Sequence, residues 1–272
     1  TAGLAAALRG APQIKSGLVS LADNASGANY RLVGRVTGGK LEYAWAQSAS
    51  GGPTGAGTMP ARTDFVALGA DAPTAERLDD LGRRLARLRA WLTLASPDNS
   101  FPYHLALKRK DGKGYVRGLA GEGVIEGETY DLVLVPDAEK VKAGFDARHV
   151  YVFAIDSDGR GTLLFPPFGR ENRVPAAGAP APSGAPPELV LGAGLEIGPP
   201  FGVDTYVLLA TGDKLGDPSV LELDPVRTRE RQRGAEDPLT ELLSAVGTRG
   251  PRPLTPPNWS IERMAIRSRA RK

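Results

Sequence analysis

Residues 149–166 have the sequence HVYVFAIDSDGRGTLLFP, the pattern of two apolar strands joined by a polar turn. Both alternating sets of side chains between Val150 and Ile155 are apolar, which indicates a strand covered on both of its faces. The turn falls at residues 156–159, because aspartate tolerates left-handed backbone and glycine adopts a positive φ at no steric cost. Pro166 ends the returning strand. The stretch therefore predicts a β-hairpin at the centre of a β-rich core.

Short apolar runs with turn residues between them continue on both sides of this hairpin. Gly38 and Gly39 are a hairpin signal between two of these runs. The predicted strands are residues 30–36, 41–47, 63–68, 103–108, 123–125, 130–135, 150–155, 162–165, 189–191, 195–197, 206–210 and 259–266. The regular spacing of these short strands, with turn residues between them, favours an antiparallel β-sandwich, immunoglobulin-like in general style. We expect a mainly β protein with some helix, of the α+β class.

One long amphipathic helix is predicted over residues 74–95, with Thr74 as its N-cap. Its leucines recur at spacings of three and four, which puts them on one stripe that packs on the parent sheet: Leu78, Leu81, Leu85, Leu88 and Leu92. Asp79 and Arg83 are four residues apart. Asp80 and Arg84 repeat this spacing, so we expect both pairs on the solvated side of the helix.

These elements divide the chain into three parts: a β-rich connecting region at 1–72, the helix at 73–97, and a β-sandwich module at 98–272. Two segments are expected to be flexible loops, because they hold too little apolar surface to offset their ordering entropy. They are the Gly/Ser-rich residues 48–61 and the Pro/Ala-rich residues 174–187. A short helix is predicted at 238–246, and the strand at 259–266 closes the module.

The chain has 272 residues, a formal net charge of +3 and no cysteine. The missing cysteine excludes disulfides, a thiolate nucleophile and cysteine-ligated zinc from this chain. Its basic residues gather toward the end, where a possible interaction surface consists of Arg227, Arg229, Arg231 and Arg233. Because no aromatic side chains interleave with these arginines, we do not expect binding to nucleic acid.

No segment has the length and apolarity of a membrane span, and no signal peptide opens the chain. The first residue is Thr1 rather than methionine, so we expect a fragment or a processed product. The absence of cysteine slightly favours a periplasmic or secreted bacterial protein over a cytoplasmic one.

Few residues offer chemistry. Asp156 and Asp158 flank a glycine turn and are weak candidates for a metal site, but the EF-hand spacing is absent and a turn role is favoured. His104 lies on a predicted strand and His149 at the edge of one, and the sequence has no G-x-S-x-G elbow, so structural roles are expected for both. The glycine-rich segments match neither a Walker motif nor a dinucleotide fingerprint, and no cofactor is predicted.

Carboxylates are the remaining candidates for catalysis. Glu122, Glu126 and Glu128 lie close together in the sequence, and Asp204 precedes the strand predicted at 206–210. Paired carboxylates can serve as acid and base in hydrolysis, provided that the fold brings them into one cleft. A carboxylate-dependent hydrolase using Glu122, Glu126 or Asp204 is therefore an open alternative.

Three segments carry a resemblance to a known family: YVFAIDSDGRGTLLFP at 151–166, GPPFGVDTYVLLAT at 198–211 and GEGVIEGETYDLVLV at 121–135. Together they resemble the bacterial domain of unknown function 4384, over about residues 102–211. Upstream, YRLVGRV, LEYAWAQ and PARTDFV are similar to the region that connects this module to caspase-like peptidase domains. The resemblance implies a region C-terminal to such a peptidase, whose catalytic cysteine is not in this chain.

Three functions follow as hypotheses. The leading one is a non-catalytic accessory or regulatory region that binds protein and positions or restrains an upstream caspase-like domain. The second is a cell-envelope or ligand-binding β-sandwich whose loops or sheet edges hold a glycan, a peptide or a metal ion. The third is the carboxylate-dependent hydrolase described above.

Overall fold

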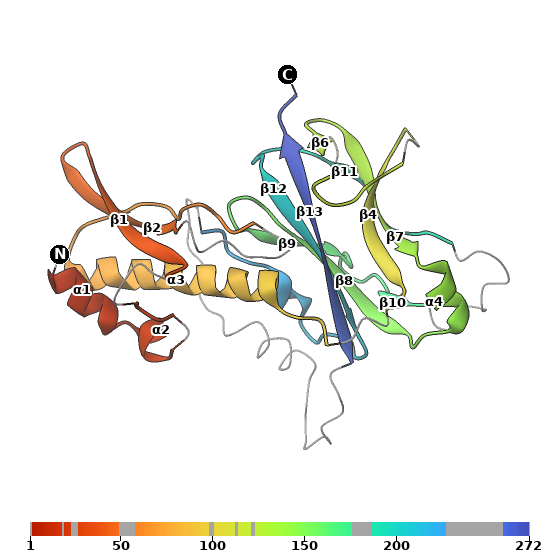
Figure 1. Ribbon diagram of the computed structural model, residues 1–272, viewed down its shortest axis with the longest axis horizontal. Coiled ribbons are helices and arrows are strands. Elements are labelled where there is room, and N and C mark those ends of the chain that lie inside the picture. The colour runs from red at the N-terminus through yellow and green to blue at the C-terminus, as the bar shows by residue number, and fades with distance from the viewer. Residues whose placement is uncertain are drawn as a thin grey trace, which may run out of the picture.

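A computed structural model describes residues 2–17, 19–22, 27–48, 58–97, 101–111, 114–120, 123–175, 187–226 and 258–271. The protein is mainly β with a few helices, an α+β fold built around a β-sandwich. Figure 1 shows the sandwich at one end and a β-hairpin at the other, with one long helix running between them. The fold class predicted from the sequence is confirmed.

The sandwich consists of two mostly antiparallel sheets. The smaller sheet has the order β11-β7-β4-β5 and contains β4 (Tyr103–Arg109), β5 (Tyr115–Val116), β7 (Thr129–Pro136) and β11 (Leu189–Glu196). The larger has the order β10-β8-β12-β13-β6, and β9 also pairs with β8. Its strands are β6 (Val124–Ile125), β8 (Arg148–Ile155), β9 (Gly161–Phe165), β10 (Arg173–Val174), β12 (Val203–Thr211) and β13 (Trp259–Arg269).

The larger sheet has a separate hydrophobic core on each of its faces. Val152, Leu208 and Ile266 point to the smaller sheet and join the core of the sandwich. Tyr151, Phe153 and other residues of alternate positions point away, into a second core shared with the long helix. Since successive side chains of a strand point to opposite faces, this explains why β8 is apolar at almost every position.

The hairpin predicted at residues 149–166 is confirmed as β8 and β9. Ile155 pairs with Gly161, so the turn comprises residues 156–160. The φ of Gly159 is +81°, and an added Cβ there would lie 3.0 Å from Leu88 of the long helix. The turn thus touches the second core as well as ending the hairpin, and glycine suits it both by conformation and by size.

The long helix α3 (Asp71–Thr93) begins and ends earlier than the predicted 74–95. Thr74 is not its N-cap: Ala70 occupies that position, and the Thr74 hydroxyl donates to the Ala70 carbonyl at 2.9 Å. Thr74 lies one turn inside the helix, where a hydroxyl can bond to the carbonyl four residues back. Leu78, Leu85, Leu88 and Leu92 are buried, as the stripe predicts, and Leu81 is half-buried.

The other elements surround α3 and the sandwich. A three-stranded sheet of order β1-β2-β3 lies over the first half of α3 and contains β1 (Tyr30–Thr37), β2 (Lys40–Gln47) and β3 (Val66–Ala67). Its predicted turn at Gly38 and Gly39 is confirmed, since both have positive φ. The other helices among the described residues are α1 (Ala2–Arg9), α2 (Pro12–Lys15), α4 (Ala138–Ala143) and the 3₁₀ turn η1 (Pro218–Leu221).

The ends of the two predicted loops need correction. Met59 falls within the predicted loop 48–61, yet it is buried in the second core, because it is the one large apolar side chain there. Val174 belongs to β10 and pairs with Arg148, so the loop predicted at 174–187 begins after it. Residues 49–57 and 176–186, and the helix predicted at 238–246, lie outside the described residues.

Replacing Trp91 tests how much the contact between α3 and the sandwich contributes to stability. Trp91 is fully buried and packs edge-on against Phe153, with 5.1 Å between ring centroids. Trp91→Ala should lower the free energy of unfolding by about 3–5 kcal/mol, through lost burial and the cavity left behind. Urea denaturation followed by circular dichroism measures this loss. Val36→Ala, at an exposed position near the hairpin tip, is the control and should cost less than about 0.5 kcal/mol.

Candidate functional site

The turn between β8 and β9 holds the weak metal candidates, Asp156 and Asp158. One carboxylate oxygen of Asp156 accepts hydrogen bonds from the main-chain N–H groups of Asp158 and Arg160, both at 2.9 Å. This geometry is an Asx turn, which organises the loop through the aspartate itself. Among the described residues, no three His, Asp or Glu side chains converge as a metal site would require. In this structure the Asp156 carboxylate therefore organises the turn.

Asp204 lies beside the same turn, at the start of β12. Burial raises the pKa of Asp204 to about 6, and the neighbouring Asp156 carboxylate adds to this rise. Its Oδ1 atom is buried without a hydrogen-bond partner, while the Ser268 side chain and the Ser157 N–H bond to the carboxylate. Burial also raises the pKa of Asp156. The two carboxyl groups thus share a poorly hydrated environment that favours their protonated forms.

The glutamates predicted near β6 have separate partners. Glu126 accepts a hydrogen bond from the main-chain N–H of Arg271 at 3.1 Å. Glu128 accepts a short hydrogen bond from the Tyr130 hydroxyl. Glu122 lies outside the described residues. Of the three carboxylates named for hydrolysis, Asp204 has Asp156 as its carboxylate neighbour, and Glu126 contacts Arg271, two residues beyond β13.

Both histidines bond to side chains from distant parts of the chain. His104 Nδ1 in β4 lies 3.1 Å from Glu262 Oε2 in β13, so this contact joins the two sheets. Burial raises the pKa of Glu262, and the nearby His104 opposes that rise. His149 Nδ1 lies 3.1 Å from Asn172 Oδ1, and the Asn172 amide donates to the Val150 carbonyl. The arginines at 227, 229, 231 and 233 lie outside the described residues.

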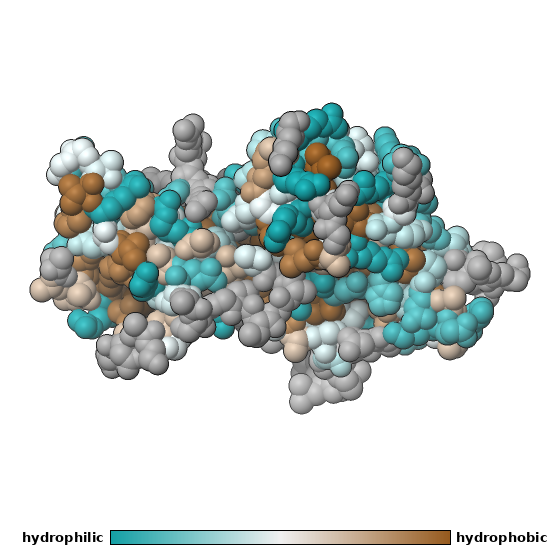
Figure 2. Space-filling model, turned by 45° about the horizontal axis from the view of Figure 1, so that its top comes forward, coloured by the Kyte–Doolittle hydropathy of each residue, from teal (hydrophilic) through white to brown (hydrophobic). Residues whose placement is uncertain are grey.

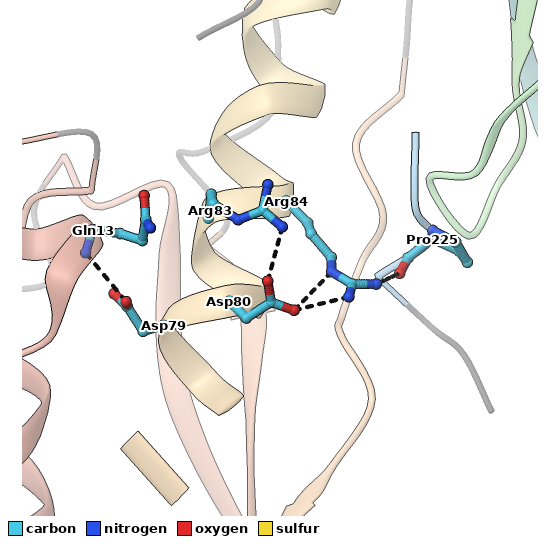
Figure 3. A network of polar contacts seen from close by, with 6 residues as sticks. All are labelled: Gln13, Asp79, Asp80, Arg83, Arg84 and Pro225. Carbon is cyan, nitrogen blue, oxygen red and sulfur yellow. Dashed lines mark hydrogen bonds and ion pairs between the residues drawn. The ribbon is translucent and has the colours of Figure 1, made fainter. Parts of the chain in front are cut away.

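A polar cluster near the middle of α3 lies on the side of the helix that the sequence predicts to be solvated (Figure 3). Asp80 binds both Arg83 at 2.8 Å and Arg84 at 2.9 Å, and Arg84 also donates to the Pro225 carbonyl at 3.0 Å. Asp79 accepts a hydrogen bond from the main-chain N–H of Gln13 at 3.2 Å. Asp79 and both arginines are therefore buried on a side that the sequence predicts to be solvated, whereas Asp80 itself stays partly exposed.

A signal for this burial was present in the sequence. Ala75, Asp79 and Gly82 are spaced four and three apart, so these two small residues share a helix face with the aspartate. Small side chains let neighbouring segments approach a helix closely. The atoms nearest to a Cβ built at Gly82 belong to Val19 and Trp45, at 3.7–3.8 Å. A second packed face could have been predicted from this spacing.

Each half of α3 is fixed by a side chain from a different sheet. The indole N–H of Trp45 in β2 donates to the Leu78 carbonyl at 2.8 Å. At the other end, Arg263 of β13 donates to the Trp91 carbonyl at 2.8 Å and, by a shorter hydrogen bond, to the Leu94 carbonyl. The last carbonyls of a helix lack partners within it, and a cation there also complements the helix dipole. Arg263 therefore caps α3 from the sandwich.

Comparisons with protein-family models, curated proteins and solved structures found no match. The resemblance to the domain of unknown function 4384 accordingly stays a prediction. Within the part of the chain that the structure describes, no helix is long and apolar enough to cross a bilayer.

Removing the shared carboxylate tests the polar cluster on α3. Asp80→Ala removes the carboxylate that binds the buried guanidinium groups of Arg83 and Arg84. We expect the free energy of unfolding to fall by about 2 kcal/mol, less than for a fully buried pair because Asp80 is partly solvated. Glu139→Ala breaks an exposed ion pair with Lys142 and is the control, with an expected loss under about 0.5 kcal/mol. Equal losses would contradict the buried role of the cluster.

The raised pKa of Asp204 predicts a pH-dependent stability. Because the folded state binds this proton more tightly than the unfolded chain, the stability that protonation contributes is present at low pH. It is lost as the pH rises through the folded pKa of about 6. Relative to the wild type, Asp204→Asn should gain about 1–2 kcal/mol in unfolding free energy between pH 4 and pH 7.

Chemical denaturation at the two pH values measures this gain. Asp146→Asn, at an exposed aspartate, should track the wild type at both pH values. A difference between wild type and Asp204→Asn that stays constant with pH would show that Asp204 does not gain its proton on folding.

Proposed function

We propose that this region is a non-catalytic accessory module that binds protein and positions a neighbouring caspase-like peptidase domain. The observation that carries the proposal is the double attachment of α3. Trp45 fixes the first half of α3 to the sheet β1-β2-β3, and Arg263 fixes the end of α3 to the sandwich. A helix held at both ends acts as a rigid spacer. Such a spacer suits a region that sets the distance and angle between two domains.

The dimensions of α3 support this role. Its 23 residues correspond to about 34 Å at 1.5 Å per residue. The hairpin of β1 and β2 and the two-sheet sandwich lie toward opposite ends of this span (Figure 1). One core of buried side chains runs along it, from Leu4 and Tyr43 to Trp259 and Ile261. Such a core resists bending better than a flexible linker, so a domain attached to one end keeps its orientation to the other.

The chemistry of the described residues supports an accessory role over a catalytic one. A caspase-like reaction needs a cysteine nucleophile, and this chain has no cysteine. His104 is bonded to Glu262 and His149 to Asn172, so each imidazole has a partner that fits a structural role. Asp156 uses its carboxylate to organise a turn. These contacts support structural roles for the two histidines and for Asp156.

Two measurements test the proposal. The 272-residue chain, mixed with the caspase-like domain encoded in the same reading frame, should sediment with it as a one-to-one complex. The chain alone should not hydrolyse peptides or glycosides, and His104→Ala and His149→Ala should leave that background unchanged. A reading frame without such a domain, or no complex with it, contradicts the positioning role. Turnover that disappears in either histidine variant contradicts the non-catalytic role.

A further inference from the structure

The outer edge of β1 has the regular geometry of a strand that can accept another strand. β1 ends the three-stranded sheet, and no strand in the described part of the chain pairs with its other edge. It pairs with β2 over eight residues without a bulge, from Tyr30 opposite Gln47 to Thr37 opposite Lys40. It contains no proline. Proline and bulges are among the devices that protect exposed edges, and β1 has neither.

The register identifies the backbone groups that point outward from this edge. The main chain of Trp45 bonds to Thr63, and that of Leu41 bonds to Leu68, so both residues direct these groups away from β1. Their partners in β1 are Leu32 and Val36. Since hydrogen-bonded and non-bonded pairs alternate in an antiparallel ladder, these partners direct their own groups outward. The outward set is therefore Tyr30, Leu32, Gly34 and Val36.

The side chains of the alternate residues make one face of this edge positive. Arg31 and Arg35 lie four residues apart on the same face of β1, about 13 Å from one another along the strand. Both are exposed. Arg35 binds Glu42 at 2.7 Å and lies over the Phe65 ring at 3.6 Å, with Arg62 over the same ring at 4.3 Å. The guanidinium groups of Arg31, Arg35 and Arg62 thus lie on the same face as Glu42.

The opposite face of the same strand is apolar. Tyr30 and Leu32 pack against the second core, and Val36, near the hairpin tip, is 71% exposed. Figure 2 shows hydrophobic and hydrophilic residues side by side on the lobe formed by this end of the molecule. An added strand would meet positive charge on one of its faces and apolar surface on the other. The surface therefore favours a strand in which acidic and apolar side chains alternate.

We propose that the edge of β1 binds an extended acidic peptide segment of a partner protein as an additional antiparallel strand. Its main chain bonds to the outward groups of Leu32, Gly34 and Val36. Acidic side chains four residues apart lie opposite Arg31 and Arg35, and apolar side chains on its other face lie beside Val36. Strand addition obtains affinity from main-chain bonds and specificity from alternate side chains. The inference rests on the proposed protein-binding role and needs no caspase-like partner.

Charge argues against a second copy of this chain as the occupant. If two β1 strands paired antiparallel through their outward groups, the arginines of both copies would gather on one face of the joint sheet. In the register centred on Val33, Arg31 of one copy lies directly opposite Arg35 of the other. Like charges directly opposite each other destabilise a sheet. An acidic segment places opposite charges there.

A designed peptide tests the proposal on the full 272-residue chain. The probe is a fluorescein-labelled nonapeptide of alternating threonine and valine, with glutamate at two threonine positions four residues apart. Fluorescence anisotropy measures its affinity, and a peptide with lysine at those two positions is the control. We expect the acidic peptide to bind more tightly. Amide exchange should slow at Leu32, Gly34 and Val36, while Arg31, Val33 and Arg35, already bonded to β2, stay unchanged.

Matched variants separate the edge from general charge effects. Arg31→Glu should weaken binding of the acidic peptide about two- to fivefold, the range of one exposed ion pair. Arg267→Glu makes the same change of charge at an exposed position of β13 and should leave the affinity unchanged. No binding, equal binding of both peptides, protection at another strand, or self-association of the chain through β1 would overturn the proposal. The complex with the caspase-like domain tests the proposed function separately.

Discussion

Trp91, near the C-terminal end of α3, packs edge-on against Phe153 in β8, with the ring planes at 74° to each other. This contact joins the helix to the larger sheet of the sandwich. Aromatic pairs in this geometry contribute about 0.5–1.5 kcal/mol beyond the area that they bury. The other half of the same helix packs against the three-stranded sheet β1-β2-β3. The position of that sheet relative to the sandwich therefore depends on this contact and on Arg263, which caps the helix beside it.

The sequence was sufficient to predict the elements whose pattern is local. The hairpin at 149–166 was predictable because both faces of β8 are apolar and its turn contains aspartate and glycine. The leucine stripe of α3 was predictable for the same reason, since a spacing of three and four defines one helix face. Each of these patterns depends only on residues within one element, so the chain displays it without its tertiary context.

Contacts between distant segments could not be predicted in this way. The ion pairs of Asp80 have the spacing of a solvated helix surface. The small residues Ala75 and Gly82 indicate a second packed face, but nothing in the sequence identifies Gln13 and Pro225 as the residues that contact it. The capping of α3 by Arg263 joins residues that are 172 positions apart. The neighbouring carboxyl groups of Asp156 and Asp204 likewise depend on the pairing of β8 with β12. Spacing in the sequence carries no signal for such pairs.

We expect the sheet β1-β2-β3, α3 and the sandwich to form one cooperative structure. Native-state hydrogen exchange measures it most directly, by comparing the opening free energies of amides in β2 and β12. One cooperative unit predicts that the most protected amides of both strands exchange through the same global unfolding, with free energies within about 1 kcal/mol of each other. Amides of β2 that open at a free energy more than about 2 kcal/mol below those of β12 would contradict the claim.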